Sequence, residues 1–187
     1  MKYVIISAPS GAGKTTIVNH LILQDFKLEF SISASSRKMR RNETDGKDYY
    51  FMTAGKFREK IANNEFIEWQ EVYKDHYYGT LKTELERIRK NGNNAIFDVD
   101  AAGGISLKRI FGTDALSVFI IPPSVEELEK RLKRRCADTY EIIALRMEKV
   151  KYELTFADRF DKIIINNNLS VALKEAEALL ADFLFNL

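Results

Sequence analysis

The chain has 187 residues, of which 45% are hydrophobic, 30% charged and 11% aromatic. This length suits one domain with a well-buried core, and the composition excludes a largely disordered or fibrous chain. Lysine and arginine number 29 against 27 aspartate and glutamate, so the net charge of +2 gives no sign of a nucleic-acid or membrane partner. Cys136 is the single cysteine, which excludes an intramolecular disulfide and a multi-cysteine metal site. The first apolar run, Tyr3–Ile6, is too short for a signal peptide or a membrane span, so we expect a cytoplasmic protein.

Apolar runs alternate with helical patterns along the chain, which is typical of a parallel α/β sheet. Buried strands are predicted at Tyr3–Ala8, Ala95–Val99, Leu116–Ile121 and Lys162–Ile165. Helices are predicted at Ile17–Leu23, at Leu81–Lys90 with Gly92 as a stop, from a capping box at Ser124–Glu127 to roughly Arg134, and from an N-cap at Thr139 to roughly Thr155. Ser170 is expected to cap a C-terminal helix with a core-facing stripe of Val171, Leu173, Leu179, Leu180 and Phe183.

Residues from about 33 to 80 break this alternation and predict an inserted lobe of mixed structure. Asp48–Met52 and Glu65–Tyr73 are aromatic-rich and strand-like, with a short helix expected at Thr53–Asn63 between them. The segment Arg37–Arg41 holds four positive charges in five residues. By itself, such a segment fits a solvated loop or a nucleic-acid patch better than a catalytic role.

A glycine-rich loop joins the first predicted strand to the first predicted helix. It reads Ala8-Pro9-Ser10-Gly11-Ala12-Gly13-Lys14-Thr15-Thr16 and departs from G-x-x-x-x-G-K-[ST] in having alanine at its first position. The glycines allow backbone N–H groups to turn toward phosphate oxygens at a helix N-terminus. Lys14 is expected to bridge the β and γ phosphates of a nucleoside triphosphate, and the Thr15 hydroxyl to bind Mg²⁺.

The inserted lobe contains residue types that suit a guanine mononucleotide. Arginine forks and tyrosine hydroxyls fit a phosphate dianion, a carboxylate accepts from both N1–H and the exocyclic amine of guanine, and a hydroxyl donates to O6. The candidates are Ser33, Arg37, Arg40, Tyr49, Glu68, Tyr78 and Thr80. Spacing does not indicate whether these side chains converge.

Several ordered motifs resemble those of guanylate kinases over nearly the whole chain. They are Ser7–Thr15, Phe30–Ser33, Gly46–Tyr49, Asn64–Trp69, Tyr77–Thr80, Phe97–Asp100 and Pro122–Glu127. The resemblance implies an α/β fold: a P-loop NTPase three-layer α/β/α core with a parallel sheet (1–32 and 81–187), a small mixed α/β GMP-binding lobe (about 33–80) and a helical lid (about 131–146). It also implies transfer of the γ-phosphoryl group of MgATP to GMP, and to dGMP, with no nucleic-acid or membrane partner, in a monomer or homodimer.

The resemblance also assigns roles to particular residues. Ser33, Glu68 and Thr80 become guanine contacts, while Arg37, Arg40, Tyr49 and Tyr78 hold the acceptor phosphate. Asp98 and Asp100 would support Mg²⁺, its waters or the acceptor nucleoside, although aspartate at a strand end also caps turns. Arg131, Arg135 and Arg146 would reach over the triphosphate and, with Lys14, stabilise the transferring group. The usual family stretch Arg-x-Pro-Arg-x-Gly-Glu reads Arg37-Lys-Met39-Arg40-Arg41-Asn-Glu43 in this chain, and Cys136 stands where the family usually has glycine after the lid arginine. The loss of proline and glycine is expected to change loop stiffness and hinge freedom.

Three other functions stay open on the sequence. A P-loop kinase for another phosphorylated acceptor would keep the loop but not the combination of Glu68, Ser33 and Thr80. A non-catalytic guanylate-kinase-like binding module typically lacks an intact loop or the acceptor residues, and nucleic-acid binding is disfavoured by the near-neutral charge. The run Asn166-Asn167-Asn168 could contact the adenine of the donor or form a turn.

Overall fold

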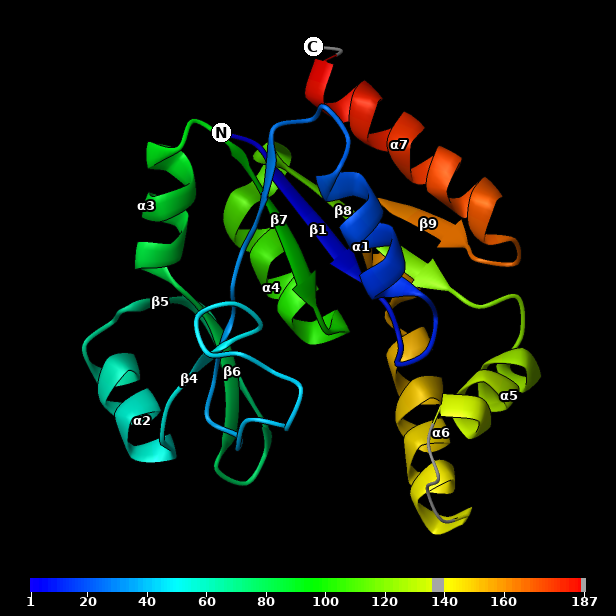
Figure 1. Cartoon of the computed structure of the whole chain (residues 1–187), viewed down its shortest axis with the longest axis horizontal. Helices are drawn as coiled ribbons and strands as arrows, with labels where there is room; N and C mark the ends of the chain where they lie inside the picture. The colour runs from blue at the N-terminus through cyan, green and yellow to red at the C-terminus, as the bar shows by residue number, and fades with distance from the viewer. Residues whose placement is uncertain (136–139, 186–187) are drawn as a thin grey trace.

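The structure, a computed structural model, describes residues 1–135 and 140–185, and the side chains from 131 to 146 lie outside the described part. Its main sheet has five parallel strands in the order β2-β7-β1-β8-β9 (Figure 1). These strands are β1 (Tyr3–Ser7), β2 (Leu28–Phe30), β7 (Asn94–Val99), β8 (Ala115–Ile121) and β9 (Lys162–Ile165). The four predicted strands are confirmed, and β1, β7 and β8 are buried apolar runs because the sheet is covered on both faces there. The predicted burial is wrong for β9, an edge strand in which Ile164 is buried but Ile163 and Ile165 are exposed.

Helices cover both faces of the main sheet and make a three-layer core. Val4 and Ile6 of β1 face α1 (Lys14–Ile22) and α7 (Leu169–Phe185) in one hydrophobic cluster. Tyr3 and Ile5 point the other way, toward α3 (Lys82–Lys90) and α4 (Ala101–Phe111). This alternation follows from the two-residue period of a strand.

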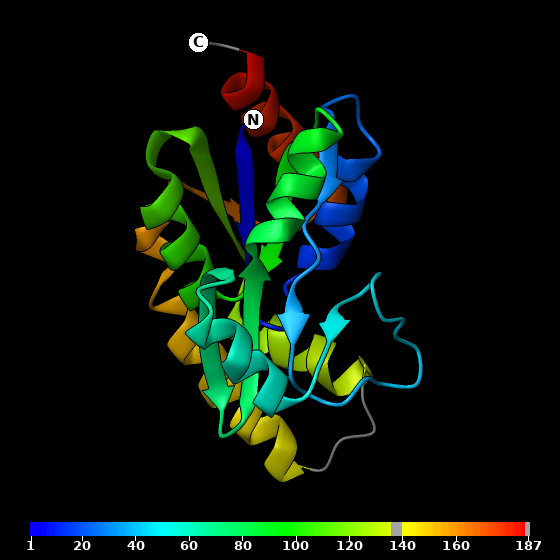
Figure 2. The same ribbon diagram turned by 90° about the vertical axis from the view of Figure 1, so that its left-hand side faces the viewer.

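A second, smaller sheet is inserted between β2 and α3 (Figure 2). Its strands are β3 (Ala34–Ser35), β4 (Tyr50–Phe51), β5 (Phe66–Tyr73) and β6 (His76–Leu81), in the order β4-β3-β6-β5 with β5 and β6 antiparallel. The predicted short helix is α2 (Ala54–Ala62), capped by the Thr53 side chain. Phe57 of α2 is fully buried and stacks on the rings of Phe66 and Tyr77. The second sheet therefore has a hydrophobic core of its own.

Two helices, α5 (Val125–Arg135) and α6 (Tyr140–Leu154), pack together beyond the carboxyl end of β8 (Figure 1). Ser124 accepts a hydrogen bond from the N–H of Glu127 at 3.1 Å, as the predicted cap requires. Thr139, the predicted cap of α6, lies outside the described residues. Of the two short 3₁₀ helices, η1 (Gly112–Asp114) lies between α4 and β8, and η2 (Ala157–Arg159) follows α6. Within the described part of the chain, no helix combines the length and apolar character needed to cross a bilayer.

The start of α7 differs from the prediction. The Asn168 side chain accepts hydrogen bonds from the N–H of Ser170 at 2.9 Å and of Val171 at 3.4 Å, so Asn168 is the capping residue and the assignment of Ser170 is wrong. Val171 is 60% exposed and does not belong to the core-facing stripe. The other members of that stripe do pack on the core: Leu173, Leu179, Leu180 and Phe183.

Two core elements are absent from the predictions. β2 is three residues long, too short for its apolar pattern to stand out. α4 contains Gly103 and Gly104, and glycine is a poor helix former. A Cβ at Gly104 would lie 2.9 Å from the ring of Phe160, so this helix needs glycine to approach its neighbour. Tertiary packing, not local helix propensity, therefore determines that residues 101–111 form a helix.

Glu84 of α3 joins the two sheets. Its carboxylate is 1% exposed and accepts from the N–H of Ile32 at 2.7 Å, the hydroxyl of Tyr50 at 2.9 Å and the guanidinium of Arg87 at 2.7 Å. Ile32 lies where the chain enters the second sheet, and Tyr50 belongs to β4. One buried carboxylate thus connects α3 both to the segment that enters the inserted region and to β4 within it.

Replacing Glu84 with alanine should destabilise the whole protein. The substitution leaves two half-buried donors without this acceptor and removes the buried carboxylate facing Arg87, so we expect the free energy of unfolding to fall by about 3–5 kcal/mol. Urea unfolding followed by circular dichroism measures the loss. Glu86→Ala, at an exposed position of the same helix, is the control and should change stability by less than about 0.5 kcal/mol. A comparable, small effect of both variants would contradict the joining role of Glu84.

Candidate active site

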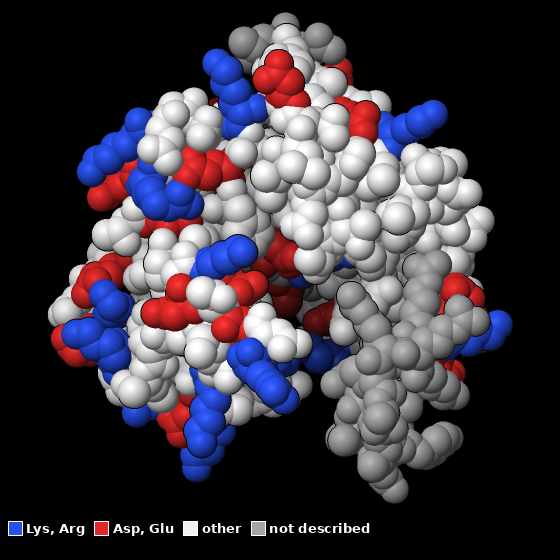
Figure 3. All heavy atoms as spheres, viewed as in Figure 1, with Lys and Arg blue, Asp and Glu red and all other residues white. Residues whose placement is uncertain are grey.

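A cavity of about 1030 Å³ opens at the carboxyl edge of the main sheet, between the second sheet and α6 (Figure 3). Acidic side chains lie inside the hollow that the space-filling view shows. Parallel α/β sheets bind ligands at this edge, because loops leave the strands there. Nine of the side chains predicted for the site line this cavity: Ser10, Lys14, Ser33, Arg40, Tyr49, Glu68, Tyr78, Asp98 and Asp100.

The glycine-rich motif, residues 8–16, forms the loop between β1 and α1 and the first residues of α1, at one end of this cavity. Gly11 and Gly13 have φ of 89° and 100°, which side chains with a Cβ rarely adopt, so both positions require glycine. Ala8 is buried and does not belong to the residues of positive φ. Alanine at the first position of the motif is therefore compatible with the loop conformation. Thr15, at the start of α1, lines an adjoining cavity together with Asp98.

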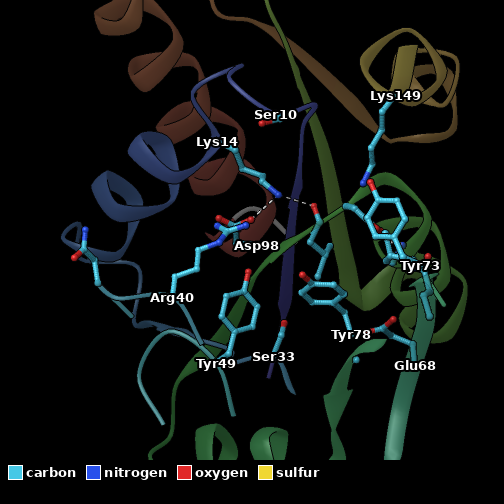
Figure 4. Close-up of a pocket in the computed structure, with 17 residues that line it drawn as sticks. Ser10, Lys14, Ser33, Arg40, Tyr49, Glu68, Tyr73, Tyr78, Asp98 and Lys149 are labelled. Atoms are coloured by element: carbon cyan, nitrogen blue, oxygen red, sulfur yellow. Dashed lines mark hydrogen bonds and ion pairs between the residues drawn. The ribbon is translucent and has the colours of Figure 1, made fainter. Parts of the chain in front are cut away.

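Lys14 is held at the end of β7 (Figure 4). Its Nζ lies 2.5 Å from Oδ1 of Asp98 and donates to the carbonyl of Val99 at 2.8 Å. Both side chains of the ion pair are 20% exposed, so they face the cavity but are partly shielded from water. Lys14, which the sequence motif predicts to bind phosphates, thus lies in the cavity wall and is paired with Asp98.

Asp100 has a structural task as well as a place in the cavity wall. Its Oδ1 accepts from the N–H of Gly103 at 2.8 Å and caps α4, and the Nε2 of Gln70 lies 3.5 Å from the same oxygen. The turn-capping alternative considered from sequence is therefore confirmed for Asp100, while Asp98 pairs with Lys14 instead. Among the described residues, no three His, Cys, Asp or Glu side chains form a metal-binding group.

Arg37 forms a bidentate ion pair with Glu43 beside the second sheet. Its guanidinium donates to both oxygens of Glu43, at 2.6 and 2.5 Å, and its Nε donates to the hydroxyl of Tyr78 at 3.1 Å. Glu43 also accepts from the N–H of Arg40 at 2.8 Å. The hydrogen bonds from Arg37 lower the pKa of Glu43 to about 2, so this carboxylate is ionised at neutral pH. Glu43 orients the loop that carries both arginines.

Glu68 projects from β5 into the cavity, and its Oε1 accepts from the hydroxyl of Thr80 at 2.9 Å. Burial raises the pKa of Glu68 to about 7; the nearby charge of Asp100 adds to this rise, and the hydrogen bonds from Thr80 oppose it. Thr80 itself is fully buried beside Glu68. A carboxyl group with this pKa can lose its proton near neutral pH and then accept two donors from a ligand.

The other predicted site residues divide into three groups. Arg37 and Thr80 do not line the cavity themselves. Arg37 contacts Tyr78 and Thr80 contacts Glu68, and both of these partners line the cavity. Of the remaining motif residues, Pro9, Gly11, Ala12 and Gly13 lie in the loop that leads into α1, and Thr16 lies in the first turn of α1. The side chains of Arg131, Arg135 and Arg146 lie outside the described residues.

Eight residues that line the cavity were not among the predicted site residues: Asn42, Gln70, Val72, Tyr73, Gly79, Val99, Gly103 and Lys149. Gln70 is two positions from Glu68 on β5 and shares its side of the strand, a signal that the two-residue period could have supplied. Tyr73 and Lys149 approach each other from β5 and α6, with the lysine Nζ 5.6 Å from the ring centre (Figure 4). Nothing in their local sequence indicates this contact, because it depends on how α6 packs beside the second sheet.

The cavity thus has a glycine-rich loop on one side and acidic and aromatic side chains of the second sheet on the other. In an α/β fold, this arrangement defines a phosphotransferase. The chain belongs to the guanylate kinase family, whose sequence model, described as guanylate kinase, matches residues 1–183. The guanylate kinase of Bacteroides fragilis is 50% identical over 183 residues, covering 98% of this chain and 90% of that protein. The guanylate kinase of Porphyromonas gingivalis is 46% identical, covering 98% of each chain.

A solved structure matches the fold. The crystal structure of guanylate kinase from Anaplasma phagocytophilum has a TM-score of 0.77 and 24% sequence identity, and the match covers 99% of this chain and 87% of that chain. The predicted fold class, a parallel α/β core with an inserted mixed region, is confirmed.

Proposed function

We propose that this protein transfers the γ-phosphoryl group of ATP to GMP, giving ADP and GDP, with dGMP as a further acceptor. The observation that carries the proposal is a single cavity bordered by Lys14 of the glycine-rich loop and by Glu68 of the second sheet. A lysine at a helix start suits a triphosphate, and a cavity-facing carboxylate suits the N1–H and amine of guanine. The near-neutral net charge fits small-molecule substrates better than a nucleic acid.

On the donor side, the β and γ phosphates would replace Asp98 as the partner of Lys14. The loop N–H groups and the start of α1 add the positive end of a helix dipole. Magnesium fits the residues present, because Thr15, Asp98 and Asp100 offer hydroxyl and carboxylate oxygens, the ligands that hard cations prefer. We assign Thr15 and Asp98, with Asp100 beside them, to hold the ion, which neutralises phosphate charge when bound.

On the acceptor side, Glu68 would accept from guanine, with Ser33 and Thr80 beside it. Arg37, Arg40, Tyr49 and Tyr78 would hold the phosphate. Arg37 would have to exchange Glu43 for the phosphate, because both of its terminal nitrogens donate to that carboxylate in this structure.

In the transfer step, an oxygen of the GMP phosphate attacks the γ-phosphorus of ATP. A new P–O bond forms while the bond to the bridging oxygen of ADP breaks. The attacking oxygen is already anionic at neutral pH, so catalysis rests on positioning, charge neutralisation and exclusion of water, with no strong general base. We assign residues 33–80 to a GMP-binding lobe, residues 1–32 and 81–187 to the core, and residues 131–146 to a lid that brings Arg131, Arg135 and Arg146 to the phosphates.

A side-by-side acceptor assay tests the proposal. The purified protein is given MgATP with GMP, dGMP, AMP, UMP or CMP, and ADP formation is followed. We expect guanine nucleotides to exceed the others by at least about 10³-fold in kcat/KM, because a site built to pair with a polar edge rejects bases that lack it. Preference for another base would indicate a kinase for a different acceptor. Binding of GMP without turnover would indicate a binding module.

A further inference from the structure

Asn166 links the last strand of the main sheet to the glycine-rich loop. It follows β9, its N–H donates to the carbonyl of Ile121 at 2.8 Å, and the residue is 5% exposed. Its side-chain Nδ2 donates to the carbonyl oxygen of Ala12 at 2.8 Å, a contact between residues 154 positions apart. The amide group of Asn166 is therefore anchored in the core and committed to the loop backbone.

This hydrogen bond fixes the direction of one loop peptide. The Ala12–Gly13 peptide is trans, and the C=O and N–H groups of a trans peptide point in opposite directions. Because Nδ2 of Asn166 holds the oxygen of Ala12 on its own side, the N–H of Gly13 is directed away from Asn166. Gly13 is the N-cap residue of α1, where backbone N–H groups have no partner within the helix and are available to an anion.

Gly13 and Asn166 also fit each other sterically. A Cβ at Gly13 would lie 2.3 Å from Nδ2 of Asn166, closer than real Cβ atoms approach any neighbour. The φ of 100° at Gly13 is a second reason for glycine. The asparagine thus occupies space that exists because position 13 has no side chain.

We propose that Asn166 is a positioning residue for the phosphate loop, which keeps the Gly13 N–H aimed at the donor phosphates. The inference rests on the proposed function, in that it takes the loop to bind the phosphates of ATP. It differs from a contact between Asn166 and the donor base, the possibility that the sequence left open. A positioning role acts on phosphate binding whether or not a base is attached.

The test compares three ligands on the protein with Asn166→Asp. This substitution keeps the size of the side chain but sets an oxygen against the carbonyl of Ala12 in place of a donor. We expect Mg²⁺-tripolyphosphate and MgATP to bind about tenfold more weakly, by equal factors, while GMP binds as to the parent protein. Isothermal titration calorimetry measures all three affinities without turnover.

Asn167→Asp is the matched control, because it makes the same change in charge at the exposed neighbouring position. It should bind all three ligands like the parent protein. If Asn166→Asp does not fold, Asn166→Ala, which removes the donor without adding charge, is measured in its place with the same expected result.

Weaker binding of ATP with unchanged tripolyphosphate would overturn the inference in favour of a base contact. Equal weakening of GMP would overturn it in favour of a general structural role, and unchanged binding of every ligand would also contradict it. Turnover of ATP with GMP by the parent protein is measured separately. Its absence would refute the proposed function, whereas the tripolyphosphate comparison would still report on Asn166.

Discussion

The Lys14→Met protein should bind GMP normally and transfer phosphate at least about 10³-fold more slowly than the parent protein, because a preformed cation aimed at developing charge contributes this much in phosphoryl transfer. The Nζ of Lys14 lies at the cavity, 2.5 Å from Asp98, and is already oriented by the carbonyl of Val99. Methionine has a similar length and flexibility but cannot neutralise phosphate charge. Single-turnover measurement with saturating ATP and GMP reports the transfer step directly.

Lys82→Met is the matched control for this prediction. Lys82 is the first residue of α3, as Lys14 is the first residue of α1, but its side chain is exposed. The control should retain full activity and similar stability. Transfer by the Lys14→Met protein at a rate within about tenfold of the parent would mean that the glycine-rich loop is not the donor site.

Much of the fold was predictable because its signals are local. Strands covered on both faces of a sheet are continuous apolar runs, and the caps at Thr53 and Ser124 are short-range hydrogen bonds. The last helix shows the limit of such signals. Asn168 and Ser170 are both good capping residues two positions apart, and which one caps depends on where β9 ends.

The kinds of residue at the site were predictable, but their partners were not. The pairing of Arg37 with Glu43 spans 6 residues, and nothing in composition or spacing distinguishes Glu43 from a solvated glutamate. The contact of Asn166 with Ala12 spans 154 residues and exists only once β9 lies beside β8. Such contacts depend on the topology of the sheet, so they become visible when the strands are in place.

The Glu68→Gln protein should lose most of its preference for guanine. Glu68 faces the cavity with one oxygen held by Thr80 at 2.9 Å, and it can accept from both N1–H and the exocyclic amine. Glutamine replaces one acceptor with an N–H₂ group that would face these donors. We expect kcat/KM for GMP to fall about 10²- to 10³-fold while that for AMP changes by less than about tenfold. Glu71→Gln, an exposed position on the same strand, should behave like the parent.

Because Glu68 titrates near neutral pH, the affinity for GMP should depend on pH. The Glu68 pKa of about 7, raised from 4.5 chiefly by burial, means that the carboxyl group is increasingly protonated below neutral pH. Because the charged form accepts from guanine, GMP affinity should rise as the pH increases from about 6 to 8. The phosphate of GMP also titrates near pH 6, so AMP, which carries the same phosphate, is titrated in parallel. The additional rise for GMP should vanish in the Glu68→Gln protein.

The free energy of unfolding should show the opposite dependence on pH, over a lower pH range. Between the ordinary pKa of 4.5 and the folded value of about 7, the native state holds a proton on Glu68 that the unfolded chain has released. The free energy of unfolding contributed by this group therefore decreases as the pH rises through that window. Urea unfolding of the ligand-free protein at pH 5 and pH 7.5 measures the change, and Glu68→Gln should remove it. An identical pH dependence with and without Glu68 would contradict a buried, proton-holding carboxyl group at the guanine pocket.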